Sequence, residues 1–442
     1  TYLGDRIGKH AYKTGASFFL LSKIICPARL PQFSDSMLPS VLIHPADYPA
    51  DPFIFRHFCL LPLILCPAAS ALPTLNYNYN ASLLQIRDGY NKIQHFSTCS
   101  DTADFPLDIP APIHYTIRKT ICHRRRTGEN HMYSFTNDYS EGAHPRILEA
   151  MMNANLTQNV GYGLDAHSLA AAGTIRRLAD APDAAVHFVV GGTQTNLLLI
   201  AAALRPYQAV IAAATGHVNV HEAGAIEGTG HKVLALPTTT GKLTPEIIAP
   251  CLAEHCDEHM VQPKLVYISD STELGTVYTK AELEALHHFC RLHGLMLYLD
   301  GARLGSALTS APNDLTLKDL AALTDAFYIG GTKNGALLGE ALVIQKDSLK
   351  EDFRFMMKNR GAMLAKGFLA GIQFEELFRD GLFFDLAAHA NEMAAILRDG
   401  IRKAGYSFVS DSHTNLLFPI LPDQLADAYT KRLHLRAVAK AR

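Results

Sequence analysis

The sequence predicts an α/β protein with a mostly parallel central sheet flanked by helices, followed by a smaller and apparently truncated C-terminal α/β domain. From Met132 onward, short apolar runs bounded by Gly, Asp or Thr alternate with amphipathic stretches. This alternation is typical of right-handed βαβ units. The chain has 442 residues, of which 48% are hydrophobic and 19% charged, so it can bury a large core.

Apolar runs mark the predicted strands. The clearest are residues 186–190 (VHFVV), 265–268 (LVYI), 295–299 (LMLYL) and 326–329 (AFYI), with a further run at 209–214. Helical patterns lie between them, and residues 279–293 give the best example, since their apolar side chains fall on one face. Ligand-binding groups gather at the carboxyl ends of parallel strands. The residues that follow each run are therefore the candidates for a site.

The chain changes character near Met132. Residues 1–131 hold 12 of the 22 prolines and a single glutamate, and we expect a poorly ordered extension there, for which a gene-model artefact is one explanation. The apolar residues 59–72 leave a weak membrane anchor as an alternative, although a spanning helix needs about 20 residues. We expect residues 132–380 to form the large domain and 381–442 an incomplete small domain.

Charge and cysteine content point away from several partners. The net charge is -2, which gives no reason to expect nucleic acid or an anionic membrane as a partner. The eight cysteines form no C-x-x-C pair and no zinc-ligand spacing. We therefore expect free thiols, no metal site and a reducing, cytoplasmic compartment.

A glycine turn follows the first predicted strand. Gly191, Gly192 and Thr193 lie between that strand and a helix predicted to start near Thr193. Glycines let the backbone approach a ligand closely, and the N–H groups of a helix start favour an anion such as phosphate. Taken alone, the same turn is also compatible with a tight connection and nothing more.

A carboxylate and a guanidinium follow the run at 295–299. Asp300 ends this strand and Arg303 lies three residues further on. An isolated pair of this kind is compatible with a structural ion pair or a helix cap. An aspartate at a strand end also suits a pyridinium nitrogen, which it keeps protonated. An arginine nearby suits the bidentate binding of a substrate carboxylate.

A lysine follows the run at 326–329. The segment after this run reads GGTKNG and contains Thr332 and Lys333. An arginine and a bound cofactor nearby would lower the pKa of the Lys333 amine, which would make it a nucleophile for an aldehyde. The alternative is a solvated lysine in a surface loop.

The fourth signal is His217, which follows the run at 209–214. A histidine here could stack on an aromatic ring, or it could be an ordinary core or surface residue. The order of the four signals is more informative than any one of them. Gly-Gly-Thr, His, Asp-x-x-Arg and Lys each come at the end of a predicted strand.

This order resembles the threonine aldolase and β-eliminating lyase family, within the aspartate-aminotransferase-like superfamily of pyridoxal-phosphate enzymes. The likeness covers about residues 133–419 and implies pyridoxal 5'-phosphate as cofactor. By the resemblance, Gly191, Gly192 and Thr193 match the phosphate-binding turn, and Thr332 beside the lysine is a further candidate contact of the cofactor. His217 matches the histidine that stacks on the cofactor ring and is a candidate for substrate chemistry.

The resemblance assigns three further roles. Asp300 matches the partner of the pyridine nitrogen, and Lys333 matches the lysine that binds the cofactor through a Schiff base. Arg303 matches a ligand of the substrate carboxylate. The segment Asn137-Asp138-Tyr139-Ser140 matches one that opens the domain and contributes to the active site, which makes Ser140 a candidate substrate contact.

The sequence departs from the family pattern at two places. Family members carry a histidine near the substrate hydroxyl where this chain has Glu273, so a carboxylate stands in for an imidazole. Its reference pKa is lower by about two units. The chain also ends soon after Pro419, and we assign the family's second carboxylate-binding arginine to none of the arginines near its end.

The resemblance implies an aldolase that cleaves L-threonine or related β-hydroxy amino acids to glycine and an aldehyde. Lys333 would hold the cofactor and Arg303 the substrate carboxylate, while the catalytic base is His217, Glu273 or a water. A β-eliminating amino-acid lyase and a truncated inactive homologue are the alternatives. The resemblance also implies a homodimer or homotetramer, because the active sites of relatives include residues from a neighbouring subunit. Tyr162 is the kind of residue that would be contributed in this way.

Overall fold

A seven-stranded sheet forms the centre of the protein in a computed structural model that describes residues 134–433. Its strand order is β1-β7-β6-β5-β4-β2-β3. The strands are β1 (Ala185–Val189), β2 (Gln208–Ala213), β3 (Val233–Leu236), β4 (Gln262–Ser269), β5 (Met296–Asp300), β6 (Ala326–Gly330) and β7 (Glu340–Ile344). All pairs are parallel except those of β7, which is antiparallel to both β1 and β6. Six strands therefore end at the same edge of the sheet.

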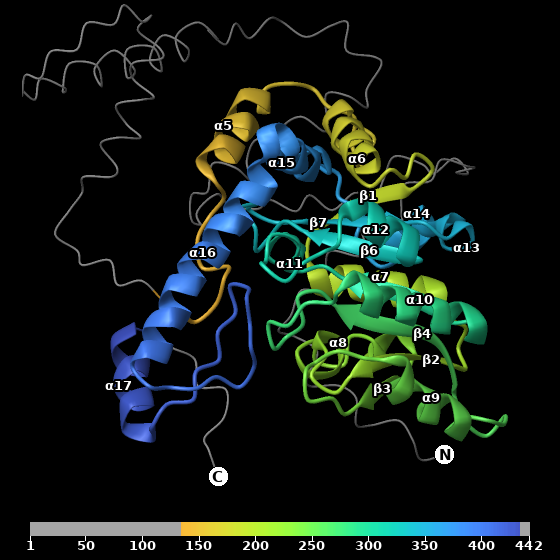
Figure 1. The fold of residues 1–442 in the computed structure, drawn as a ribbon. Coiled ribbons are helices and arrows are strands. Elements are labelled where there is room, and N and C mark those ends of the chain that lie inside the picture. Colours follow the sequence, from red (N-terminus) through yellow and green to blue (C-terminus); the bar gives the residue numbers. More distant parts are fainter. Residues whose placement is uncertain (1–133, 434–442) are drawn as a thin grey trace, which may run out of the picture. The chain divides into compact units, whose positions relative to one another are not determined.

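Helices cover both faces of this sheet (Figure 1). The helices before β5 are α5 (Pro145–Ala154), α6 (Ala166–Leu178), α7 (Gly192–Ala203), α8 (His217–Val220), α9 (Pro245–Glu254) and α10 (Lys280–His293), with the 3₁₀ turn η3 (Glu227–Thr229). Those after β5 are α11 (Leu304–Leu308), α12 (Leu317–Leu323), α13 (Asp347–Lys350), α14 (Phe353–Asn359), α15 (Phe368–Phe378), α16 (Leu382–Lys403) and α17 (Asp423–Leu433), with the 3₁₀ turn η4 (Arg379–Gly381).

The core has two parts, one on each face of the sheet. Along β4, Val266 and Ile268 pack into the part beneath α6, α9, α10, α12 and α15, whereas Leu265 and Tyr267 pack into the part beneath α7 and α14. The alternation follows from the two-residue period of a strand. A strand buried on both sides reads as a continuous apolar run, which is how these strands appear in the sequence.

The predicted helix at 279–293 is confirmed as α10. Thr279 is its N-cap and forms a capping box with Glu282, and Gly294 ends the helix in the left-handed conformation. The predicted mostly parallel sheet is confirmed as well. The antiparallel strand β7, which follows the lysine segment, was not among the predicted strands.

The C-terminal part begins with the long helix α16, which follows positive-φ residues Asp380 and Gly381. After α16, the described residues contain an isolated antiparallel bridge between Phe408 and Pro419, and then α17. The division between 132–380 and 381–442 stays a prediction. The expected extension at 1–131 and the apolar residues 59–72 lie outside the described residues. Between residues 134 and 433, no helix is long and apolar enough to cross a membrane.

Candidate active site

The turn after β1 leads into an uncapped helix start. Gly191 is the N-cap of α7, and among the described residues no side chain caps this helix. A Cβ on Gly192 would lie 2.8 Å from the Tyr328 hydroxyl, so only glycine fits there without a shift. Thr193 is exposed at the same turn. Because the first N–H groups of a helix have no partner within it, this turn fits a phosphate group.

Asp300 at the end of β5 is buried and surrounded by donors. It accepts hydrogen bonds from the Tyr267 hydroxyl at 2.6 Å, the Ala302 N–H at 2.9 Å and the Asn196 side-chain amide at 3.0 Å. Both oxygens of the carboxyl group therefore accept hydrogen bonds. A buried carboxylate held in this way fits the protonated ring nitrogen of pyridoxal phosphate.

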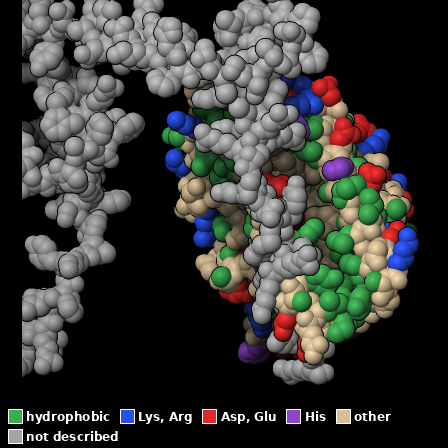
Figure 2. Space-filling model, turned by 90° about the vertical axis from the view of Figure 1, so that its left-hand side faces the viewer, with side chains coloured by type: hydrophobic (Ala, Val, Ile, Leu, Met, Phe, Trp, Pro, Cys, Tyr) green, Lys and Arg blue, Asp and Glu red, His purple; other side chains and the backbone are tan. Residues whose placement is uncertain are grey.

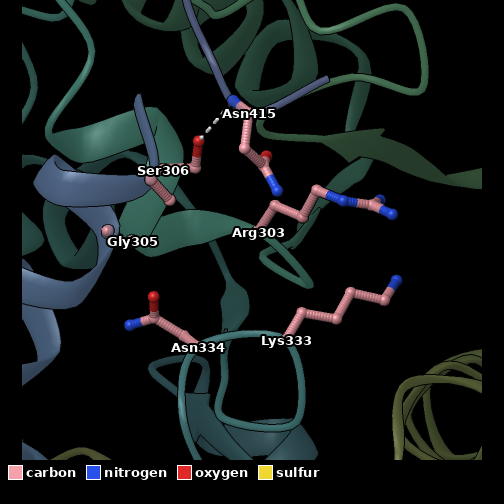
Figure 3. Close-up of a pocket in the computed structure, with 8 residues that line it drawn as sticks. Arg303, Gly305, Ser306, Lys333, Asn334 and Asn415 are labelled. Carbon is pink, nitrogen blue, oxygen red and sulfur yellow. Dashed lines mark hydrogen bonds between the residues drawn. The ribbon is translucent and has the colours of Figure 1, made fainter. Parts of the chain in front are cut away.

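Lys333 follows β6 and lines a pocket with Arg303, Asn334 and Asn415 (Figure 3). In this view the Lys333 and Arg303 side chains extend toward the same side, whereas Asn334 points away. The Lys333 amine lies 5.9 Å from the centre of the Tyr139 ring. Burial, reinforced by the charge of Arg303, lowers the pKa of Lys333. The uncharged amine, which is the nucleophilic form, is therefore more populated than in an exposed lysine.

Arg303 is held by the carboxylate of Asp138, which was not among the predicted site residues. Its Nε and Nη2 donate to the two oxygens of Asp138 at 2.6 and 3.0 Å, and the Asn415 amide donates to Asp138 at 3.0 Å. Burial by itself would raise the pKa of Asp138, but the charge and hydrogen bonds of Arg303 lower it overall. Asp138 lies in the segment that the family resemblance pointed to, so position was the only signal for it.

His217 starts α8 directly after β2 and contacts two carboxylates. Its Nδ1 lies 2.8 Å from Glu222 Oε1, and its backbone N–H donates to Glu273 Oε1 at 2.8 Å. The Ser269 hydroxyl also donates to Glu273, at 2.7 Å. Burial raises the pKa of Glu273 above its ordinary value. The two residues predicted as candidate bases, His217 and Glu273, are therefore neighbours.

Ser140 and Thr332 make local contacts in this structure. The exposed Ser140 hydroxyl donates to Asn137 at 2.8 Å, so its contact is within its own loop. The Thr332 hydroxyl accepts from the Gly339 N–H at 3.0 Å and so holds the loop that carries Lys333. No cluster of three or more metal-binding side chains occurs among residues 134–433.

The fold and this set of groups define a pyridoxal-phosphate-dependent lyase of the aminotransferase fold. A single mutant of Thermus thermophilus aspartate aminotransferase shares the fold, with a TM-score of 0.52 and 16% identity over 70% of this chain and 83% of that one. Residues 135–423 match the family model for the beta-eliminating lyases, and the chain belongs to this family.

Several relatives are threonine aldolases. The low specificity L-threonine aldolase of Pseudomonas aeruginosa is 33% identical over 309 residues, which are 69% of this chain and 88% of that protein. The structure of Leishmania major threonine aldolase is 55% identical, with a TM-score of 0.67 over 68% of this chain and 87% of that one. The predicted family resemblance is confirmed.

Proposed function

We propose that this chain is a pyridoxal-phosphate-dependent aldolase that cleaves L-threonine or a related β-hydroxy amino acid to glycine and an aldehyde. One observation carries the proposal. The partly buried Lys333 shares a pocket with Arg303, while Asp300 ends the neighbouring strand. The nearness of these groups at one edge of the sheet supports a role for Lys333 at the cofactor aldehyde, Arg303 at the substrate carboxylate and Asp300 at the ring nitrogen.

The cofactor would be held at four points. Gly191, Gly192, Thr193 and Thr332 would bind the phosphate, Asp300 the ring nitrogen and His217 one face of the ring, and Lys333 would bond to the aldehyde. When bound, pyridoxal phosphate accepts the electron pair that is released as the substrate Cα–Cβ bond breaks.

Arg303 would orient the substrate through its carboxylate, with Ser140 as a second contact. Asp138 takes Nε and Nη2 of the guanidinium, which leaves Nη1 for the substrate. A base then takes the proton of the β-hydroxyl oxygen as the aldehyde forms, and a proton returned to Cα completes glycine. His217, Glu273 and a water remain the candidate bases. Because burial raises the pKa of Glu273, its carboxylate accepts a proton more readily than an exposed glutamate does.

Lys333→Ala tests the proposal. We expect this variant to lose aldehyde release from L-threonine and the visible absorption band of lysine-bound cofactor, because the lysine amine is the only group proposed to bond to the aldehyde. Lys232→Ala, which removes an exposed lysine, should keep both. Turnover at the wild-type rate in Lys333→Ala would disprove the assignment.

Product analysis distinguishes the aldolase from the two alternative functions. A β-eliminating lyase on the same scaffold would release pyruvate and ammonia in place of glycine and an aldehyde. An inactive homologue would give no products and no absorption change when glycine is added to the protein with pyridoxal phosphate.

We also propose a homodimer or homotetramer in the cytoplasm. Hydrophobic side chains gather in patches on the face seen in Figure 2, and Met152, Leu156 and Val160 are 71%, 93% and 63% exposed on the segment before α6. Tyr162 lies two residues further on and is 45% exposed. The described cysteines are free thiols, which suits a reducing compartment. Sedimentation velocity of the full chain measures the oligomer size.

A further inference from the structure

The buried side-chain amide of Asn196 connects two carboxylates. One is Glu222, next to His217, and the other is Asp300, at the candidate cofactor site. Asn196 lies on α7 and is fully buried. Its side-chain nitrogen donates to Glu222 Oε1 at 2.7 Å and to Asp300 Oδ2 at 3.0 Å, and its oxygen accepts from the Tyr298 hydroxyl at 2.8 Å. If the side-chain amide were flipped, its oxygen would face the two carboxylates and could form no hydrogen bond with them. The orientation of Asn196 is thus fixed by its three partners.

Glu222 connects this amide to His217. The Glu222 side chain has no exposed surface, and its Oε1 receives both the Asn196 amide and His217 Nδ1. An ionised carboxylate only accepts hydrogen bonds, so the proton of the neutral imidazole lies on Nδ1. The other ring nitrogen, Nε2, is then left without a proton. One third of the His217 side chain is exposed (33%), so its ring borders the open part of the site.

Asp300 is fixed at the other end of the same chain of bonds. Its Oδ2 accepts from both Tyr267 and Asn196, at 2.6 and 3.0 Å. Burial and the charge of Asp300 raise the pKa of Tyr267 and of Tyr298 well above their usual range, so both hydroxyls stay protonated and available as donors. These shared bonds hold the members of the network in one arrangement, with Glu222 bonded through Oε1 alone among the described residues.

We propose that Glu222 and Asn196 are positioning residues: Glu222 holds His217 as the Nδ1–H tautomer, and Asn196 ties Glu222 to Asp300 in one rigid unit. The meaning of this unit for the cofactor rests on the proposed function, since His217 would lie on the ring face and Asp300 at the ring nitrogen. The tautomer itself is a property of the protein without cofactor. Through Asn196, the residue on the face and the residue at the nitrogen keep a fixed relative position.

The tautomer is tested by nuclear magnetic resonance of ¹⁵N-histidine-labelled full chain without cofactor. His217 is identified among the 21 histidines as the signal missing in His217→Asn. We expect the wild-type ring to be a single Nδ1–H tautomer. Glu222→Gln, which keeps a carbonyl acceptor, should preserve it. Glu222→Leu should shift the ring toward the Nε2–H form that free imidazole prefers. A wild-type Nε2–H ring, or no change in a folded Glu222→Leu, would overturn the proposal.

Asn196→Leu tests the connection to Asp300. This variant removes the donor between two buried carboxylates, so we expect the affinity of the protein without cofactor for pyridoxal phosphate to fall tenfold or more, while the Nδ1–H tautomer is kept. Unchanged affinity would overturn the role of Asn196. If Asn196→Leu does not fold, Asn196→Ser gives the same comparison, since a hydroxyl has one proton and cannot donate to both carboxylates.

The two proposals fail separately. Turnover in Lys333→Ala with an Nδ1–H His217 would remove the proposed function and leave the network standing. Loss of turnover in Lys333→Ala together with an Nε2–H tautomer of His217 would support the proposed function and overturn the network.

Discussion

Arg303 shows how single residues set the chemistry of this site. Its guanidinium is bound at two nitrogens by Asp138, and the Asn415 amide fixes Asp138 in turn. Arginine and carboxylate groups form a planar bidentate pair, so Asp138 sets the plane in which the remaining guanidinium nitrogen lies. We interpret Asp138 as a residue that orients Arg303 for the substrate carboxylate.

Asp138→Asn tests this interpretation. We expect kcat/KM for L-threonine to fall about tenfold to a hundredfold, since a hydrogen bond to a charged group contributes about 1.5–3 kcal/mol. The control is Asp347→Asn, which alters an exposed carboxylate that pairs with Lys350 at 2.7 Å and should change nothing. A lower KM in Asp138→Asn would contradict the prediction, because it would mean that Asp138 competes with the substrate for Arg303.

At the scale of elements, the site depends on how closely two strand ends approach. A Cβ added to Gly301, just after β5, would lie 1.9 Å from the backbone oxygen of Tyr328 on β6. The obstacle is backbone, so it has no rotamer that relieves the clash. Glycine at this position is what allows Asp300 and Lys333 to follow adjacent strands.

Gly301→Ala should therefore destabilise the protein by about 1–3 kcal/mol or more, the usual cost of overpacking, and weaken cofactor binding. Gly228→Ala is the matched control, because a Cβ there meets nothing within 4 Å among the described residues. Urea unfolding followed by circular dichroism compares the two. Equal midpoints for both variants would show that β5 and β6 can separate at no cost.

The elements explain what could be predicted from the sequence. Apolar runs are local signals, so five of the seven strands of the sheet, α10 and the residues at those strand ends were predictable, whereas β3 and β7 were not predicted. Asp138 lies 165 residues from Arg303, and Asn415 lies 277 residues from Asp138. Such pairs leave no local pattern. Asn196 was not predicted for the same reason. It is an asparagine in a mostly apolar helix, and its hydrogen-bond partners lie 26 to 104 residues away in the sequence.

For the whole molecule, the pH dependence of stability should come from buried carboxyls rather than from net charge. The net charge of the chain is only -2, so general repulsion is weak near neutral pH. Asp270 and Glu340 are 1% and 4% exposed. Burial raises the pKa of each to about 8, whereas both titrate near 4 in an unfolded chain. Near neutral pH both are therefore mainly protonated in the folded protein.

Stability should consequently fall as the pH rises. A folded-state pKa above the unfolded one gives a contribution that is complete below the unfolded pKa and is lost as the pH passes the folded value near 8. One pKa unit corresponds to about 1.4 kcal/mol, so each carboxyl should cost a few kcal/mol between about pH 5 and 9. Urea unfolding of the cofactor-free protein across this range measures the slope. Asp270→Asn and Glu340→Gln should each flatten it, because an amide does not titrate, and the wild-type slope in both variants would place the pH dependence in other groups.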